Sequence, residues 1–157
     1  MNQTSNLSLA DVGAEDQHTK RISLAYESID QAFPDVDPGL RPFGSKVLVQ
    51  IRTPMKRTRG GIVIPEESRD TELWNTQVSK VITLGPVAFR DRDTLKEWPE
   101  GQWVQPGAFV RCPKYGGDRW EVPVPNSQDA ALFCLFNDLE LGGEITGDPL
   151  EMVAFLK

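Results

Sequence analysis

The sequence predicts an all-β protein, a small barrel preceded by a short helical arm. Short runs of β-branched and aromatic residues recur from Arg41 onward, and proline or glycine bounds each run. No stretch of useful length after residue 40 has helical periodicity. The chain has 157 residues, of which 39% are hydrophobic and 25% charged, so its size and composition suit one globular domain with extensions.

Five strands are expected, with a sixth element near the C-terminus. The strands cover residues 46–51, 78–84, 108–112, 119–122 and 132–136. The last of these is nearly all apolar, which is typical of a strand buried on both faces. Residues 150–156 are expected to form a further strand or a short helix. The expected core residues are Val47, Val49, Val81, Ile82, Phe109, Val110, Phe133 and Leu135.

An acidic extension precedes the predicted barrel. Residues 1–40 carry seven acidic and two basic residues, whereas the rest of the chain is close to neutral. Residues 1–18 are polar and lack periodicity, so we expect them to be flexible. Residues 19–33 are expected to form a short amphipathic helix, either docked as an arm or part of a partly ordered linker. Its apolar face would hold Ile22, Ala25, Tyr26, Ile29 and Phe33. We divide the chain into an extension (1–40), a barrel (41–141) and a C-terminal extension (142–157).

The composition and the missing motifs argue against several functions. No apolar run approaches the ~20 residues needed to span a bilayer, and no basic face marks a nucleic-acid binder. Two cysteines, Cys112 and Cys134, and one histidine, His18, are too few for a zinc site or a catalytic triad. Phosphate-binding glycine loops and nucleophile elbows are also missing. We therefore expect a cytoplasmic protein that is no enzyme and has no cofactor, metal site, membrane partner or nucleic-acid partner.

The segment between the first two strands carries the strongest functional signal. It runs from Arg52 to about Asn75 and is charged at both ends. Its middle holds three consecutive β-branched apolar residues, Ile62, Val63 and Ile64. A flexible Gly60-Gly61 precedes this tripeptide, and Pro65 restricts its exit. Two interpretations remain open: a short extra strand folded back onto the barrel, or an extended apolar segment that binds a groove on a partner.

Six segments, in order and spacing, resemble GroES-type co-chaperonins over about residues 41–141. The opening strand matches residues 41–49 (RPFGSKVLV), the mobile loop 60–65 (GGIVIP), and the strand before the roof hairpin 78–85 (VSKVITLG). A turn and strand match residues 104–110 (VQPGAFV), a tyrosine-glycine turn 113–117 (PKYGG), and the closing strand with its following segment 132–141 (LFCLFNDLEL). The Gly-Gly-Ile core of the loop is the most specific of these motifs.

The resemblance implies a small GroES-like β-barrel with a long mobile loop and a roof hairpin, which acts as a co-chaperonin lid. In that family seven subunits form a ring. Each subunit lowers its loop into a groove of a GroEL-type chaperonin, which binds the ATP and encloses an unfolded client. The implied partner-binding residues are Gly60, Gly61, Ile62, Val63 and Ile64, and the candidate for lining the cavity is Tyr115.

Two further expectations concern the loop and the ring. The apolar tripeptide, residues 62–64, should carry chaperonin binding while contributing little to the stability of the fold. In the ring, the family pairs the first strand of one subunit with the closing strand of the next, here about residues 46–51 and 132–141, because exposed strand edges need partners.

The chain also departs from the family pattern. The acidic leader and the C-terminal tail have no counterpart in shorter members, and the roof region at residues 86–100 is longer. Ala108 replaces an aspartate, and Glu140 stands where alanine is favoured. These departures suggest a divergent, phage-encoded member that acts in a host cytoplasm. They leave open an alternative: a structural β-barrel protein, such as a viral capsid accessory, that kept the fold without the chaperonin role.

Overall fold

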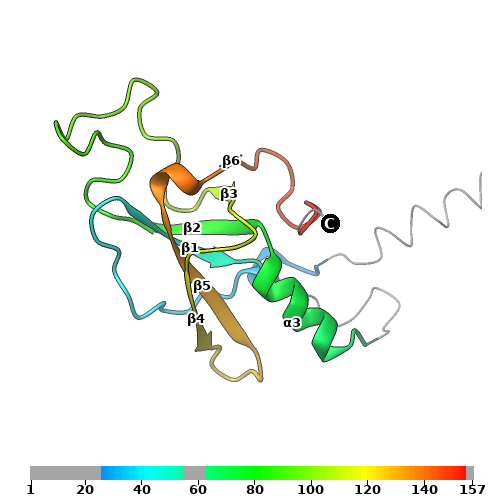
Figure 1. The fold of residues 1–157 in the computed structure, drawn as a ribbon. Helices are drawn as coiled ribbons and strands as arrows, with labels where there is room; N and C mark the ends of the chain where they lie inside the picture. The colour runs from blue at the N-terminus through cyan, green and yellow to red at the C-terminus, as the bar shows by residue number, and fades with distance from the viewer. Residues whose placement is uncertain (1–25, 55–62, 155–157) are drawn as a thin grey trace, which may run out of the picture.

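The computed structural model describes residues 26–54 and 63–154 (Figure 1). This part of the chain is mostly strand with few short helices, which confirms the all-β fold. The strands are β1 (Lys46–Ile51), β2 (Val78–Leu84), β3 (Phe109–Arg111), β4 (Asp118–Pro123), β5 (Ala130–Asn137) and β6 (Gly143–Glu144). The helices are α2 (Ile29–Ala32), α3 (Glu66–Asn75) and the 3-10 turn η1 (Asp138–Glu140).

The six strands form one antiparallel sheet in the order β4-β5-β1-β2-β3-β6. In Figure 1, β4 and β5 run steeply across β1 and β2, which reflects a strong twist. Strands β1 and β2 span the residues predicted for them, and β3, β4 and β5 begin and end within two residues of the prediction. The predicted pairing between subunits through residues 46–51 and 132–141 is wrong, because β1 and β5 are interior strands with both neighbours in their own chain.

The main core lies against one face of this sheet and is closed over by Leu73 of α3 and by residues of the roof region. β1 is buried on both faces, because Val47 and Val49 point into the main core and Leu48 into a cluster on the opposite face. Five predicted core residues are fully buried: Val47, Val49, Val81, Val110 and Phe133. The other three are half-buried and pack against two smaller clusters: Ile82, Phe109 and Leu135. The two cysteines are free thiols in the core.

The N-terminal arm and the C-terminal extension meet in one of these smaller clusters, which we call the arm cluster. Its buried members are Tyr26, Ala32, Phe33, Val78 and Ile145. The rings of Phe33 and Phe109 lie 5.2 Å apart between centroids, so the arm also contacts β3. Segments from both ends of the described chain therefore cover the same side of the sheet.

In the described part of the arm, residues 26–33, helix covers fewer residues than the apolar spacing predicted. Helix α2 is a single turn, begun by the Ser28 hydroxyl, which accepts a hydrogen bond from the Gln31 N–H, and followed by Pro34. Ile29 is 39% exposed, although it was predicted on the buried face. Ile22 and Ala25 lie outside the described residues.

Two further elements differ from the sequence prediction. Helix α3 stands where only loop was expected, and the sixth strand is Gly143–Glu144, which pairs with β3. Residues 150–154 form turns and bends, so the strand or helix predicted at 150–156 is wrong for its described part. None of the helices in residues 26–54 and 63–154 is long and apolar enough to cross a membrane.

The roof region between β2 and β3 is held by an aromatic cluster. Trp98 and Trp103 pack with ring centroids 4.9 Å apart, and each lies 5.8 Å from the ring of Phe89. Phe89 adopts a left-handed φ of 60°, a conformation that costs roughly 1–3 kcal/mol for such a residue. Its N–H donates to the buried carboxylate of Asp138 at 2.9 Å, so η1 holds this strained residue in place.

Candidate functional site

The chain leaves β1 toward the predicted partner-binding loop at a fixed position. The Arg52 N–H donates to the carbonyl of Val78 at 3.0 Å, and the Thr53 N–H donates to the carbonyl of Ala32 at 2.8 Å. The Tyr26 hydroxyl donates to the carbonyl of Thr53. This exit, residues 52–54, is thus tied to β2 on one side and to the N-terminal arm on the other.

The structure describes two of the five residues predicted to bind a partner. Gly60, Gly61 and Ile62 lie outside the described residues. Val63 is 62% exposed, whereas Ile64 is half-buried and packs against the arm cluster. Ile64 therefore contacts the fold through the arm cluster, and its role in partner binding stays a prediction. Val63 presents its side chain to solvent.

Helix α3 returns the chain from the loop to the sheet. Its Leu73 packs in the main core, and Thr76, which follows the helix, is fully buried and donates its hydroxyl to the carbonyl of Glu72. Trp74 is 45% exposed on the same helix. The loop therefore has two anchored stems, the exit at residues 52–54 and the return through α3.

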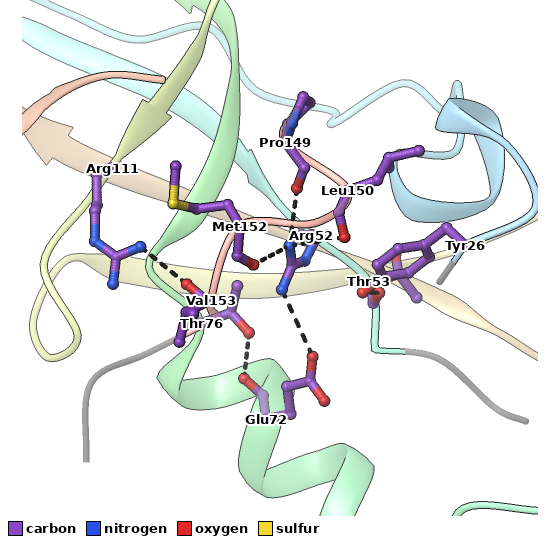
Figure 2. A network of polar contacts seen from close by, with 10 residues as sticks. All are labelled: Tyr26, Arg52, Thr53, Glu72, Thr76, Arg111, Pro149, Leu150, Met152 and Val153. Atoms are coloured by element: carbon purple, nitrogen blue, oxygen red, sulfur yellow. Dashed lines mark hydrogen bonds and ion pairs between the residues drawn. The ribbon is translucent and has the colours of Figure 1, made fainter. Parts of the chain in front are cut away.

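A buried guanidinium joins the two stems (Figure 2). Arg52 is 4% exposed, its Nη2 lies 4.0 Å from Oε1 of Glu72, and its Cζ lies 5.4 Å from the ring centroid of Tyr26. Burial raises the pKa of Glu72 and of Tyr26, and the positive charge of Arg52 opposes both shifts. Sequence reasoning missed this group, because a charged residue at the end of a strand looks like the start of a solvated loop.

Tyr115, the predicted cavity-lining residue, lies in the turn before β4 and is 73% exposed. Lys114 Nζ lies 5.4 Å from its ring centroid. The turn depends on Gly117, where φ is 73° and a Cβ would lie 2.4 Å from the Sγ of Cys134. Tyr115 is therefore displayed on a rigid turn, and its role toward a cavity stays a prediction.

The described residues offer little for nucleophilic or metal chemistry. Burial raises the pKa of the Cys134 thiol to about 12 and also raises that of Cys112, so both thiols are protonated near neutral pH. Within residues 26–54 and 63–154, no three His, Cys, Asp or Glu side chains come together to hold a metal ion. What the region between β1 and β2 offers is an exposed aliphatic residue, Val63, beside two anchored stems.

Comparison with known proteins identifies the class to which this fold and loop belong. The family model described as the chaperonin 10 kDa subunit matches residues 39–138, a stretch that contains β1 to β5 and the loop. Because the match covers more than half of the chain, the protein belongs to the chaperonin 10 kDa family of co-chaperonins.

A particular relative supports the same assignment. The chain is 31% identical over 87 residues to the co-chaperonin GroES of Methylacidiphilum infernorum (isolate V4). The aligned region covers 55% of this chain and 80% of that protein. The resemblance to GroES-type co-chaperonins that the sequence motifs predicted is confirmed.

Proposed function

We propose that this protein is a lid for a GroEL-type chaperonin and assists ATP-dependent folding of a client enclosed beneath it. The observation that carries the proposal is the family match across the sheet and the loop, together with the exposed Val63 inside the matched region. The binding residues in this proposal are Gly60, Gly61, Ile62, Val63 and Ile64. The chain supplies no catalysis and no cofactor, and the partner binds the ATP.

The energetics of such a loop suit a lid that attaches and detaches. Burial of one aliphatic side chain in a partner's groove contributes ~1.5–3 kcal/mol. Ordering the loop on binding costs roughly 1–2 kcal/mol per residue. One loop should therefore bind weakly, whereas several loops on one ring bind tightly through their high effective concentration.

The remaining parts of the proposal concern assembly and place of action. We propose a homo-oligomeric ring of seven subunits, with residues 41–141 as its body and residues 1–40 and 142–157 as added extensions. In it, Tyr115 faces the enclosed client. Neither a membrane nor a nucleic acid takes part, and the protein acts in the cytoplasm, that of a host if the chain is viral.

The proposal is tested by Val63→Asp, with Val153→Asp as its matched control. The two side chains are almost equally exposed, 62% and 61%, so neither change should alter the free energy of unfolding by more than about 0.5 kcal/mol. A carboxylate at Val63 would enter an apolar groove at a cost of at least ~2 kcal/mol per loop, which should abolish binding by a ring.

The measurement is co-sedimentation with a purified GroEL-type chaperonin in the presence of ATP. Wild-type protein and Val153→Asp should bind, and Val63→Asp should remain in the supernatant. Equal binding of both variants would contradict the assignment of the loop, and no binding of the wild-type protein would contradict the lid function.

A further inference from the structure

Arg52 is a charged residue in a buried position, at the point where the chain leaves β1. Only 4% of its surface is exposed. A charge removed from water is tolerated only when hydrogen bonds and opposite charge replace the lost hydration. The groups that surround this guanidinium therefore show which segment of the chain Arg52 fastens.

Main-chain carbonyls of the C-terminal tail are the closest of these groups (Figure 2). Nη1 of Arg52 donates to the carbonyls of Met152 at 2.7 Å and Pro149 at 2.8 Å, and it lies 3.4 Å from that of Leu150. These carbonyls lie about a hundred residues after Arg52 in the sequence. The Arg52 side chain therefore fastens the C-terminal tail to the end of β1.

The tail is folded so that its carbonyls converge on one cation. The N–H groups of Glu151 and Met152 both donate to the carbonyl of Asp148, and the Leu150 N–H donates to the Asp148 carboxylate. One helix-like turn of this kind leaves the carbonyls at its C-terminal end without backbone partners, and an arginine is a natural donor to such carbonyls. Arg52 is the donor to the carbonyls of this turn.

The same guanidinium also reaches both stems of the loop. It belongs to the exit itself, and its Nη2 faces Glu72 of α3, the return. Two further bonds fasten the tail beside α3: the Arg111 side chain donates to the carbonyl of Val153 at 2.9 Å, and the Gln77 N–H donates to that of Ala154 at 2.6 Å. The exit, the return through α3 and the tail are therefore joined at the Arg52 guanidinium.

We propose that Arg52 is a positioning residue, which fastens the tail (residues 148–154) as a strap across the two stems and so fixes the base from which the loop reaches its partner. The effect on chaperonin binding rests on the proposed function, whereas the strap itself does not. A segment whose stems are held in one orientation loses less conformational freedom on binding, and identical orientation in every subunit lets several loops engage together.

Two variants release the strap by independent routes. Arg52→Met removes the donor, and Asp148→Ala removes the carboxylate that shapes the turn without touching Arg52. Glu151→Ala is the control, because its exposed side chain lies in the same turn and the change leaves the backbone bonds in place. If Arg52→Met does not fold, Asp148→Ala decides the outcome.

Hydrogen exchange detected by mass spectrometry and chaperonin binding kinetics are measured on the full-length proteins. In both test variants, amides of residues 150–154 should exchange at least tenfold faster than in the wild type. Binding to a GroEL-type chaperonin with ATP should weaken at least fivefold. Glu151→Ala should match the wild type in both measurements.

Each contrary result overturns a defined part of the proposal. Unchanged exchange in both test variants would show that Arg52 does not hold a strap. Faster exchange with unchanged chaperonin binding would show that the strap does not position the loop. If the wild-type protein itself does not bind the chaperonin, the proposed function and the positioning role fall together, and the exchange result still decides the strap.

Discussion

Replacement of Gly85 by alanine should destabilise the sheet at the junction between β2 and the roof region. A methyl group there would lie 2.2 Å from the carbonyl oxygen of Gly44 and 2.9 Å from that of Lys46. Neither oxygen can move freely, because Lys46 accepts from the Gly85 N–H at 2.8 Å and Gly44 accepts from the Val87 N–H at 3.0 Å. The substitution must therefore push two backbone segments apart by roughly 1 Å to restore ordinary contact distances.

The expected cost follows from these contacts. Overpacking costs ~1–3 kcal/mol, and two strained hydrogen bonds add about 1 kcal/mol each. Gly85→Ala should thus lower the free energy of unfolding by about 3–5 kcal/mol and the melting temperature by roughly 6–20 °C. Urea titration followed by tryptophan fluorescence measures the change.

Gly143→Ala is the matched control for this prediction. It lies in β6 with no heavy atom within 4 Å of the added methyl group, so its effect should stay within about 0.5 kcal/mol. If the free energy of unfolding of Gly85→Ala lies within 1 kcal/mol of the wild-type value, the close approach at this junction does not constrain the fold, and the reasoning is wrong.

Three other residues or residue pairs give independent tests. Asp138→Ala should lower the free energy of unfolding by about 2–3 kcal/mol in urea titration, because the buried Phe89 N–H loses its acceptor. Asp138→Asn should lower it by less, and equal stability of the wild type and both variants would contradict this. Burial raises the folded-state pKa of Glu72 above the ordinary value of 4.5, so the folded protein holds this proton more tightly than the unfolded chain. The wild type should therefore lose stability relative to Glu72→Gln as the pH rises above about 4.5, and a relative gain over that interval would show that attraction by Arg52 dominates. Finally, Cys112 and Cys134 should resist iodoacetamide at pH 8 in the folded protein and react in urea, as mass spectrometry would reveal.

The strands were predictable because their signal is local. β1 and β2 are short β-branched runs bounded by glycine or proline, and both appear at the predicted residues. β6 has no such signal, since its glycine and glutamate are both exposed and the strand exists only through pairing with β3. Its formation depends on a long-range contact that a sequence pattern does not contain.

Helix α3 was missed for a different reason. Leu73 is its buried residue, so no apolar stripe recurs at helical spacing. The available signal was at its start, where Pro65 precedes Glu66 and Glu67 in the first turn. A proline followed by acidic residues is typical of a helix N-terminus even where the periodicity is absent.

The candidate site was predictable only in its sequence motif. The exposed Val63 agrees with an apolar segment offered to a partner, but the packing of Ile64 against the arm cluster depends on the docked extension. The partners of Arg52 come from residues 149–152, about a hundred positions away, so no spacing rule links them. Contacts made by extensions that shorter relatives lack could not be inferred from a family pattern either.

Native mass spectrometry of the protein mixed with a GroEL-type chaperonin tests the central claim most directly. Spectra are compared with and without ATP, and Val63→Asp is measured beside the wild type. The lid account predicts an ATP-dependent complex whose added mass equals seven copies of this chain, and no such complex for the variant. A wild-type protein that remains unbound in the presence of ATP would contradict the account.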